Sequence, residues 1–358
     1  MKAMVLAAGV GSRLDPLTTS VPKPLVPIAN RPVMEHILRL LAKNGITDLI
    51  ANLHYLPDQL RQYFGDGRDF GVNLQFHFER ELSGDAGGVR ACRHFLMDGT
   101  FLVMMGDLLT DCQLSAIIKQ HQAKGALATI ATKRVDNVEH FGVVVADQEG
   151  WISGFQEKPK REEALSNCAS AGIYVLEPEI FKEMPETGVF GFGRQLFPAL
   201  VEKGAPVLAV EIESYWSDVG TIPQYRQSNF DALNQLVHVD MPCIKQETTD
   251  TYTIYFDRNA DVEEGAQISG TALIGSGSRI RRGARLSNSV IIGANVVIEE
   301  DVVLDNVVIW PGSRVQRGAR LSNSIVGDSC IIEQESKHFE VTAMAQPSPQ
   351  YSCAKPAH

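Results

Sequence analysis

The residues best suited to chemistry lie in one stretch near the N-terminus, Leu6 to Pro27, which combines two glycines, two basic side chains and four prolines. It follows a short apolar run that predicts a buried parallel strand. Gly9 and Gly11 allow the backbone to turn sharply and to approach a ligand closely. A loop at the end of a strand presents backbone N–H groups to a phosphate, and Arg13 and Lys23 add two cations. The stretch therefore predicts a stiff phosphate-binding loop, although Gly-x-Gly by itself is also typical of an ordinary turn.

Longer motifs extend this pattern, namely Leu14-Asp15-Pro16-Leu17-Thr18 and Pro22-Lys23-Pro24-Leu25. With the two glycines and Arg13 they closely resemble the signature of the sugar-1-phosphate nucleotidyltransferases. The resemblance implies that Arg13 and Lys23 are catalytic. The nucleotide-binding residues that it implies are Leu6, Ala8, Gly9, Gly11, Ser12, Arg13, Asp85 and Gly87.

The reaction of such enzymes joins a nucleoside triphosphate to a sugar 1-phosphate, by in-line attack on the α-phosphorus with pyrophosphate leaving. Two polyanions must meet, so cations and a hard metal ion are required. Magnesium prefers oxygen ligands and usually takes one or two carboxylates. Asp107 follows an expected strand, and Asp218 in Trp216-x-Asp218-Val219-Gly220 resembles the second metal motif of the family. We expect both residues to be catalytic Mg²⁺ ligands; the alternative is that each caps a following helix.

A second motif resembles the sugar-phosphate site of the same family. In Phe155-Gln156-Glu157-Lys158-Pro159, the resemblance implies that Glu157 accepts hydrogen bonds from sugar hydroxyls and that Lys158 meets the phosphate. Without the resemblance, Glu157-Lys158-Pro159 would also fit an exposed strand end that carries two neighbouring side chains of opposite charge. Gly142, Ser170 and Gly172 complete the expected sugar-phosphate site; Ser170 departs from the family, which more often has Asn there.

The second glycine-rich turn, Ser83-Gly84-Asp85-Ala86-Gly87, differs from the Leu-Gly-Thr-Ala-Gly of many relatives. Asp85 could accept a hydrogen bond from guanine, or it could cap a helix that starts at Ala86. Leu108 replaces the Asn that follows the metal Asp in many thymidylyltransferases. These departures favour the mannose-1-phosphate guanylyltransferase branch, with GTP and mannose 1-phosphate as substrates. Thymidylyl, uridylyl or adenylyl transfer to glucose 1-phosphate is the alternative.

Two other classes of function compete with this interpretation. A catalytically silent regulatory paralogue would keep the fold and bind a nucleotide sugar, but it would not need Arg13, Lys23, Asp107, Lys158 and Asp218 together. Acyltransferases with hexapeptide repeats commonly use a histidine base, and no histidine lies between His238 and His338. Transfer of a nucleotidyl group remains the favoured function.

The composition limits the cellular context. The formal net charge of −10 disfavours nucleic-acid binding, which needs a basic surface. The six cysteines have no zinc or redox spacing, which indicates reduced thiols. The N-terminal apolar run is too short for a signal peptide, and no segment is long enough to cross a bilayer. We therefore expect a cytoplasmic protein that contacts neither membrane nor nucleic acid.

The first two thirds of the chain alternate between strand and helix patterns. This alternation predicts an α/β domain of Rossmann-like type over residues 1–236, with a mostly parallel sheet whose strand ends carry the ligand site. Expected strands cover residues 49–52, 72–78, 101–105, 126–131, 142–146, 151–155, 171–176 and 206–211. Expected helices cover residues 31–44, 57–64, 86–95, 114–124, 194–203 and about 220–236.

The last third repeats every six residues. Aliphatic residues recur at Val262, Ile268, Ile274, Ile280, Leu286, Ile292, Ile298 and Leu304, and Arg-Gly-Ala-Arg-Leu-Ser-Asn-Ser occurs at 282–289 and at 317–324. This period predicts a left-handed parallel β-helix over residues 256–333. The two copies are 35 residues apart, one short of two 18-residue coils, and Leu304 to Ile309 is a step of five. The register is therefore expected to slip there.

The remaining segments are expected to be a linker at 237–255 and a flexible tail at 334–358. The β-helix is expected to make a homo-oligomer. Stacked coils would bring Arg282, Arg285, Arg317 and Arg320 close to one another. Such a cluster of like charges would favour an acidic partner surface in another subunit, or it would be a solvated basic stripe that only protects the β-helix from aggregation.

Overall fold

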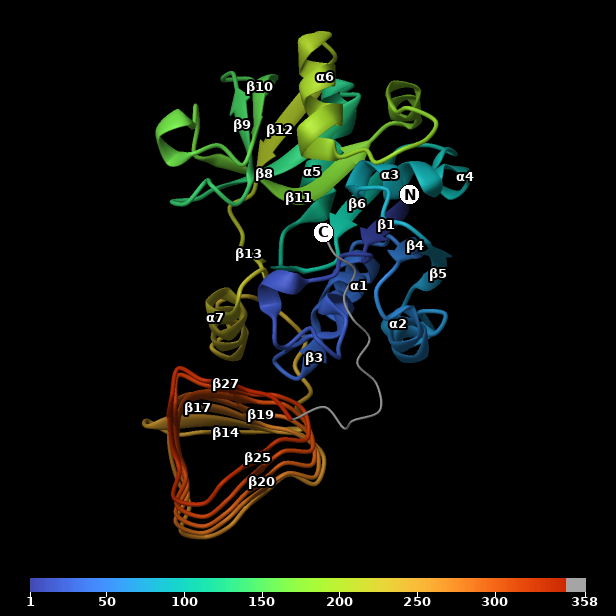
Figure 1. The fold of residues 1–358 in the computed structure, drawn as a ribbon. Coiled ribbons are helices and arrows are strands. Elements are labelled where there is room, and N and C mark those ends of the chain that lie inside the picture. The colour runs from blue at the N-terminus through green and yellow to red at the C-terminus, as the bar shows by residue number, and fades with distance from the viewer. Residues whose placement is uncertain (346–358) are drawn as a thin grey trace. The chain divides into compact units, whose positions relative to one another are not determined.

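The computed structural model describes residues 1–345, and its contacts divide the chain into two compact units (Figure 1). One unit comprises Met1–Val10 and Met34–Asp218, and the other comprises Gly11–Val33 and the chain from Val219 onward. This division differs from the expected boundary at residue 236. The reason is that Gly11–Val33 packs with helix α7 (Ile222–Leu233), whose Asn229 Oδ1 accepts a hydrogen bond from Ala29 N at 3.0 Å.

The first unit is built on a nine-stranded sheet in the order β10-β9-β11-β6-β1-β4-β5, in which β8 also pairs with β11 and with β12. The strands are β1 (Lys2–Leu6), β4 (Asp48–Leu53), β5 (Asn73–Phe78), β6 (Phe101–Met105), β8 (Ala128–Arg134), β9 (Gly142–Ala146), β10 (Ile152–Glu157), β11 (Cys168–Leu176) and β12 (Val207–Glu211).

The central strands of this sheet run parallel, as predicted. β6, β1, β4 and β5 are parallel neighbours, and β12 is parallel to β8. Only β11 and β10 run in the opposite direction, because each pairs antiparallel with its neighbours. The centre of β1, Ala3 to Val5, is fully buried, which explains its continuous apolar run. The predicted α/β fold is confirmed.

The helices of this unit agree with the sequence pattern except at two breaks. They are α1 (Val33–Lys43), α2 (Pro57–Phe64), α3 (Asp85–Ala91), α4 (Arg93–Leu96), α5 (Leu114–Lys124) and α6 (Phe197–Glu202). The helix predicted at 86–95 breaks at Cys92, whose ψ of 11° is not helical. The helix predicted at 194–203 begins as a π-helical turn, Phe192–Leu196, and continues as α6 from Phe197, with Pro198 tolerated in the first turn of α6.

A short antiparallel pair, β7 (Leu108–Thr110) with β13 (Trp216–Asp218), was not predicted from the sequence. Each strand has three residues, too few for a period-two pattern to be visible. The pair joins segments more than a hundred residues apart, which only the tertiary structure reveals.

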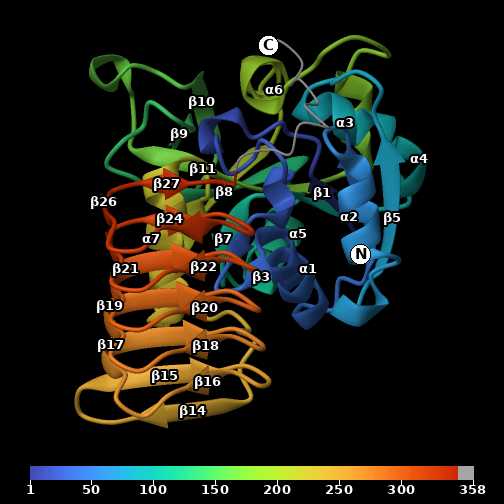
Figure 2. The same ribbon diagram turned by 60° about the horizontal axis from the view of Figure 1, so that its bottom comes forward.

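The second unit contains the predicted β-helix, whose coils lie one above another in Figure 2. One ladder contains β14 (Lys245–Thr248), β15 (Tyr252–Phe256), β17 (Gln267–Ile274), β19 (Arg285–Ile292), β21 (Val303–Ile309), β23 (Arg320–Ser322), β26 (Lys337–Phe339), β24 (Ile325–Val326) and β27 (Thr342–Ala343). The other contains β16 (Asp261–Val262), β18 (Arg279–Ile280), β20 (Val297–Ile298), β22 (Arg314–Val315) and β25 (Ile331–Ile332). The second unit also contains Gly11–Val33, called the signature segment below, which adds the hairpin of β2 (Pro27–Ile28) and β3 (Arg31–Pro32).

The predicted register slip occurs where the sequence indicated it. Between β19 and β21, Ser287 lies opposite Asp305, but Val290 lies opposite Val307, so the coil loses one residue inside the step from Leu304 to Ile309. One corner of the coil is occupied by Gly270, Asn288, Asn306 and Asn323, all with positive φ. Asn and Gly tolerate this left-handed conformation better than other residues, which explains the recurring Asn of the repeat.

The β-helix is longer than predicted at both ends. β14 and β15 lie in the range expected to be a linker, and β15 pairs in parallel with β17. β26 and β27 lie in the range expected to be a flexible tail, and they pair with β23 and β24. Their side chains lack the hexapeptide pattern, and pairing with a preceding coil orders them instead. Residues 346–358 of the expected tail lie outside the described residues.

The predicted cluster of arginines is wrong. Arg285 and Arg320 are separated by a whole coil, in which Val303 occupies the same position. Acidic residues lie next to the remaining arginines: Arg317 Nη2 is 3.3 Å from Asp301 Oδ2. Glu263 accepts hydrogen bonds from the side chain of Arg281 and from Arg282 N. Arg285 and Arg320 therefore do not stack on each other, and Arg317 has an acidic neighbour.

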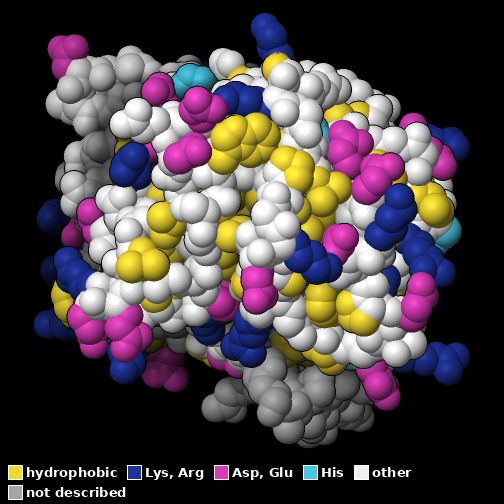
Figure 3. Space-filling model, turned by 90° about the horizontal axis from the view of Figure 1, so that it is seen from above, with side chains coloured by type: hydrophobic (Ala, Val, Ile, Leu, Met, Phe, Trp, Pro, Cys, Tyr) yellow, Lys and Arg dark blue, Asp and Glu magenta, His cyan; other side chains and the backbone are white. Residues whose placement is uncertain are grey.

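The charged surface is mixed as well. On the face drawn in Figure 3, basic and acidic side chains are interspersed, with hydrophobic side chains visible between them. None of the helices within residues 1–345 has the length and apolar character needed to cross a membrane.

Candidate functional site

The signature loop begins with Gly11, which must be glycine for two reasons. Its φ of +71° is left-handed, and a Cβ there would lie 2.9 Å from Cβ of Lys23. Gly11 therefore lets the two ends of the loop pack closely. Gly9 has no atom within 4 Å of an added Cβ, so its surroundings are open rather than crowded.

The loop is held by its own hydrogen bonds. The carbonyl oxygen of Gly11 accepts bonds from Leu14 N at 3.0 Å and from Thr18 Oγ1 at 2.7 Å. Thr18 Oγ1 also lies 2.9 Å from Asp15 Oδ1. Two three-residue 3-10 turns, at 12–14 and 23–25, are the helical turns of this segment, as expected for its proline content. Arg13 is exposed, whereas Lys23 is buried.

The end of the signature segment is braced within its own unit. Ala29 and Asn30 have positive φ and form the turn of the β2–β3 hairpin. The side-chain nitrogen of Asn30 donates to the carbonyl of Ile292 in the β-helix at 2.8 Å. Helix α7 is tied to the same β-helix, because Trp310 Nε1 donates to Tyr225 OH at 2.7 Å. The β-helix therefore supports the segment that carries Arg13 and Lys23.

The two candidate metal ligands come together in the first unit. Asp107 follows Gly106, whose N–H donates to Leu6 O at 2.9 Å and whose missing Cβ would lie 2.7 Å from that oxygen. Asp218 lies directly opposite Leu108 in the β7–β13 pair. The sequence neighbour of Asp107 is thus the register partner of Asp218, so the backbones of the two aspartates lie next to each other at one edge of the fold.

The capping alternative for these two residues is excluded by the elements that follow them. The residues after Asp107 form a strand, and the next helix, α5, begins seven residues later at Leu114, with Gln113 as its N-cap. The helix after Asp218, α7, is capped by Thr221, whose Oγ1 accepts from Gln224 N at 3.4 Å. Neither carboxylate is the N-cap of a helix.

The donor set at this edge fits magnesium in kind. It offers carboxylate oxygens from two residues, which is the number that Mg²⁺ usually takes from protein when phosphates supply the rest. Within residues 1–345 no group of three or more His, Cys, Asp or Glu side chains is arranged to hold a metal ion.

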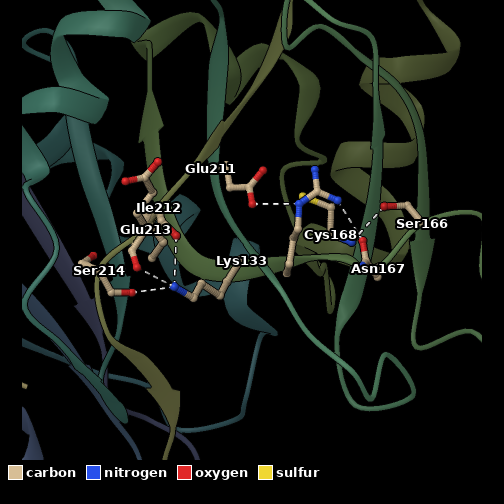
Figure 4. Close-up of polar contacts among 9 residues, drawn as sticks. Lys133, Ser166, Asn167, Cys168, Glu211, Ile212, Glu213 and Ser214 are labelled. Atoms are coloured by element: carbon tan, nitrogen blue, oxygen red, sulfur yellow. Dashed lines mark hydrogen bonds and ion pairs between the residues drawn. The ribbon is translucent and has the colours of Figure 1, made fainter. Parts of the chain in front are cut away.

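A cluster missed by sequence reasoning fixes the segment that leads to Asp218. Lys133 Nζ donates to three successive carbonyls, those of Ile212 at 3.3 Å, Glu213 at 2.9 Å and Ser214 at 2.7 Å (Figure 4). The next carbonyl, of Tyr215, accepts from Thr110 Oγ1 at 2.6 Å. Every carbonyl from 212 to 215 is therefore bound by a side chain of β8 or β7.

Trp216 completes this attachment, since its Nε1 donates to the carbonyl of Ala171 in β11 at 2.8 Å. Ala171 lies between Ser170 and Gly172, two of the candidate sugar residues. The strand that carries Asp218 is thus bonded to the strand that carries the sugar candidates. No sequence pattern marks Lys133, because a lysine near a strand end normally faces solvent.

The Glu157 side chain lies against glycine. Gly142 is its register partner, and a Cβ on Gly142 would lie 2.5 Å from the Phe155 ring and 3.3 Å from Glu157 Oε2. A Cβ on Gly193 would overlap the same carboxylate. Lys158 has a φ of +50°, and its ammonium lies 3.7 Å from Glu157 Oε1. The structure thus brings Gly142, Glu157 and Lys158 together, and it adds Gly193.

Ser170 and Gly172 lie on β11 at the same place. Ser170 Oγ is 3.2 Å from Tyr174 OH. Burial raises the pKa of Tyr174, and the nearby carboxylates of Asp85 and Glu157 raise it further. Gly172 has a φ of +70°, and a Cβ there would lie 2.8 Å from Met105 Cγ, so only glycine lets β11 cross the end of β6.

Asp85 is the first residue of α3 and does not cap it in the usual way. The N-cap is Gly84, and Asp85 Oδ1 accepts from Ala86 N and from Phe192 N, both at 2.7 Å. Burial raises the pKa of Asp85, while these backbone bonds and the charge of Lys158 act in the opposite direction. Its carboxylate therefore ties the second glycine turn to the π-helical turn.

A buried network behind this turn was also missed. Glu79 Oε1 accepts from Asn52 Nδ2 at 2.6 Å, and Glu79 Oε2 accepts from Ser83 N at 3.1 Å and Oγ at 2.5 Å. Asn52 Oδ1 accepts from Ala7 N at 2.8 Å, and Gly88 leaves room for the Asn52 amide. The network joins the end of β1 to the second glycine turn. Polar residues at the ends of the expected strands 49–52 and 72–78 were the available signal.

Comparison with known proteins identifies the family of this chain. The nucleotidyl transferase family matches residues 2–235, and the LbH domain described for EIF2B subunit epsilon matches residues 251–344. A UTP–glucose-1-phosphate uridylyltransferase of Synechocystis is 37% identical over 324 residues, covering 87% of this chain and 83% of that protein.

Mannose-1-phosphate guanylyltransferases are similar too. That of Saccharomyces cerevisiae is 34% identical over 66% of each chain. That of Mycobacterium tuberculosis is 30% identical over 78% of this chain and 76% of its own. A crystal structure from Bacillus anthracis, described as a glucose-1-phosphate thymidylyltransferase with sucrose, has 26% identity and a TM-score of 0.59, covering 64% of this chain and 94% of that one. The chain belongs to the nucleotidyl transferase family and carries a C-terminal left-handed β-helix.

Proposed function

We propose that this protein transfers a nucleotidyl group from a nucleoside triphosphate to a sugar 1-phosphate, giving a nucleoside diphosphate sugar and pyrophosphate. The observation that carries the proposal is the register of β7 and β13, which brings Asp218 beside the residue that follows Asp107. Two carboxylates at the end of a parallel sheet suit a reaction between two polyanions. Membership of the nucleotidyl transferase family supports the same reaction.

In the proposed reaction a phosphate oxygen of the sugar 1-phosphate attacks the α-phosphorus. A new P–O bond forms there, the bond between the α-phosphorus and its bridging oxygen breaks, and pyrophosphate leaves with that electron pair. Arg13 and Lys23 neutralise the triphosphate. Asp107 and Asp218 would hold Mg²⁺, which supplies charge neutralisation at the reacting phosphates. No protein nucleophile is needed.

Glu157 and Lys158 bind the sugar 1-phosphate in this proposal. The carboxylate accepts hydrogen bonds from sugar hydroxyls and the ammonium meets the phosphate. Gly142 and Gly172 let backbone lie against the sugar, and Ser170 supplies a hydroxyl. On the nucleotide side, Leu6, Ala8, Gly9, Gly11, Ser12, Asp85 and Gly87 are the proposed contacts.

GTP with mannose 1-phosphate is the pair that we propose. The yeast and mycobacterial relatives named above are mannose-1-phosphate guanylyltransferases. A carboxylate at the second glycine turn, Asp85, matches the N–H donors on the Watson–Crick edge of guanine. Its Oδ1 is already bonded to the backbone, so only its second oxygen would face a base.

UTP with glucose 1-phosphate is the second candidate pair. The Synechocystis relative, named a UTP–glucose-1-phosphate uridylyltransferase, covers 87% of this chain, including the β-helix. Uracil has one N–H donor on its pairing edge where guanine has two types, so the single oxygen of Asp85 could serve either base.

The deciding experiment is a matrix of four nucleoside triphosphates against mannose 1-phosphate and glucose 1-phosphate, followed by pyrophosphate release with Mg²⁺. We expect GTP and mannose 1-phosphate to give the highest kcat/KM. A preference above about tenfold for UTP and glucose 1-phosphate selects the second pair. Nucleotide-sugar binding without pyrophosphate release in any combination would instead support a silent regulatory protein.

Two variants separate the roles of the two substrates. Lys23→Ala should mainly lower kcat, because charge stabilisation at the reacting phosphates is lost. Glu157→Gln should mainly raise KM for the sugar 1-phosphate. An effect of Glu157→Gln on the nucleotide alone contradicts the assignment.

We further propose that the β-helix assembles the protein into a homo-oligomer. Its last coil exposes Ile331 and Phe339, each about two thirds accessible. Light scattering should show a species larger than 39.3 kDa at micromolar concentration. A monomer would remove this role, whatever the activity.

A further inference from the structure

Five strands of the first unit close on themselves. β12, β8, β11, β9 and β10 are paired in that order, and the circle is completed by Trp151 at the start of β10, which bridges to Leu208 of β12. Ala209 N also donates to Gly150 O at 2.8 Å. The mouth of a small closed barrel is a common place for a ligand pocket.

A groove of about 540 Å³ lies at this barrel. Its lining includes Thr132 and Arg134 from β8, Val144 from β9, Cys168 from β11 and Glu211 from β12. The volume is within the range of pockets for small molecules. The groove is distinct from the candidate sugar residues but adjoins them, because Ser170 is the register partner of Thr132.

Thr132 is the unusual residue in this groove. It is only 1% exposed, and its hydroxyl oxygen has no hydrogen-bond partner among residues 1–345. Thr129, three residues earlier on the same strand, is also fully buried, but its hydroxyl lies 2.8 Å from His121 Nδ1. A buried hydroxyl without a partner destabilises the folded state, and Thr132 is one of the residues that line the groove, so its unpartnered hydroxyl points to a ligand.

The groove also contains an ion pair between a basic donor, Arg134, and an acidic acceptor, Glu211. Arg134 Nε donates to Glu211 Oε1 at 2.9 Å and Arg134 Nη1 donates to Asn167 Oδ1 at 3.1 Å. Glu211 and Asn167 are labelled in Figure 4. The side chains of this ion pair are 63% and 45% exposed, so the pair adds little to stability. Remaining guanidinium N–H groups and the second carboxylate oxygen can still bind another molecule.

We propose that this groove binds a neutral sugar, as a site separate from that of the phosphorylated substrate. The lining has one basic residue, Arg134, and two acidic ones, Asp147 and Glu211, so an anion is disfavoured. A sugar hydroxyl both donates and accepts, which suits an Arg–Glu pair and a threonine hydroxyl together. Apolar side chains such as Leu165 and Ala209 suit the C–H face of the ring.

The first test compares two matched variants on one strand by thermal unfolding without ligand. Thr132→Val replaces the hydroxyl by a methyl of similar size, and we expect Tm to rise, because an unsatisfied group is removed. Thr129→Val should lower Tm, because Nδ1 of the buried His121 loses its partner. If Thr132→Val lowers Tm as much as Thr129→Val does, the hydroxyl is already satisfied and the proposal is overturned.

The second test measures binding of methyl α-mannoside and methyl α-glucoside by saturation-transfer difference NMR. The wild-type protein should give a signal with at least one glycoside, and Thr132→Val should weaken binding at least tenfold. The signal should persist with saturating sugar 1-phosphate and in Glu157→Gln, which separates this groove from the substrate site. It should also persist with inorganic phosphate.

Three outcomes would overturn the proposal. The wild-type protein could give no signal with either glycoside. Sugar 1-phosphate could displace the glycoside, with Glu157→Gln abolishing the signal, which would assign it to the substrate site. Inorganic phosphate could displace it in a Thr132-dependent way, which would make the ligand an anion. Because no step depends on nucleotidyl transfer, failure of the proposed reaction leaves these readouts interpretable.

Discussion

Asp218 lies directly opposite Leu108, so its backbone is one residue away from that of Asp107 across an antiparallel pair. The two aspartates are 111 positions apart in the sequence, yet they share one short ladder. Side-chain hydrogen bonds from Lys133, Thr110 and Trp216 attach the segment before Asp218 to the sheet. A carboxylate held in this way is preorganised, which lowers the reorganisation needed when a metal ion and phosphates bind.

Asp107→Asn and Asp218→Asn should each lower kcat by roughly 10²-fold or more, since a metal contributes several kcal/mol of charge stabilisation. Pyrophosphate release measures the effect, and circular dichroism checks that the fold is retained. Asp66→Asn, an exposed aspartate that accepts from Arg68 N, is the control and should be near wild-type. A near-normal rate in either variant would remove that residue from the metal site.

Lys133→Met should loosen the segment that leads to Asp218, because three carbonyls lose their donor. We expect kcat to fall roughly 10–100-fold with little change in either KM, as for a misplaced catalytic group. Lys133→Arg should recover much of the loss. Lys124→Met is the control, because Lys124 Nζ binds a single carbonyl, that of Glu149, at 3.2 Å.

A second readout for Lys133 does not depend on activity. Glu213 is exposed, and a glutamate-specific protease should cut after it faster in Lys133→Met than in the wild-type protein. Equal cleavage rates with a reduced kcat would show that Lys133 acts through something other than this segment.

Asp85 should give the folded state a pH-dependent stability. Burial raises its pKa above the ordinary value of 3.8, so the folded state binds this proton more tightly than the unfolded chain. Its stabilising contribution is complete below the ordinary pKa and is lost as the pH rises through the raised pKa. Asp85→Asn keeps an acceptor for Ala86 N and Phe192 N but does not titrate.

Urea unfolding at a series of pH values tests this directly. The free energy of unfolding of Asp85→Asn, relative to wild-type, should grow from about pH 4 upward and then level off. Asp136→Asn, at an exposed aspartate, should show no such trend. A pH-independent loss of stability in Asp85→Asn would contradict the predicted cost of ionisation.

Asn30→Gly should weaken nucleotide binding. Glycine keeps the positive φ of this turn but removes the hydrogen bond to the carbonyl of Ile292, which braces the signature segment against the β-helix. We expect KM for the nucleoside triphosphate to rise several-fold while KM for the sugar 1-phosphate stays unchanged. Asn259→Gly, at another positive φ in the β-helix, is the control. An equal rise in KM for both substrates would contradict a specific role of the Asn30 hydrogen bond in nucleotide binding.

Much of the fold followed from local pattern. The predicted strands at 101–105 and 142–146 and the predicted helices at 57–64 and 114–124 match their observed bounds, because apolar periodicity decides which face of each element is buried. The register slip near Leu304 followed from counting residues. The helix predicted at 86–95 is broken at Cys92, whose backbone is not helical. The helix propensity of cysteine does not predict a break there.

The types and motifs of the residues indicated the candidate site, but they did not indicate the contacts that hold these residues in place. Asp107 could be placed from the strand before it. By contrast, β13, Lys133 and the Glu79 network depend on contacts between distant segments, and each is a polar group that a single sequence gives no reason to bury. Three-residue strands and buried hydrogen bonds carry no periodic signal.

The sequence by itself determined the α/β and β-helix architecture, the family resemblance and the candidate residues, because motifs and hydrophobic periods are local properties of the chain. Only the tertiary structure decided that Asp218 lies opposite Leu108 beside Asp107, that Val303 separates Arg285 from Arg320, and that the Thr132 hydroxyl is buried without a partner among residues 1–345. Each of these depends on register between strands. Register is set by packing of the whole sheet, which no local stretch encodes.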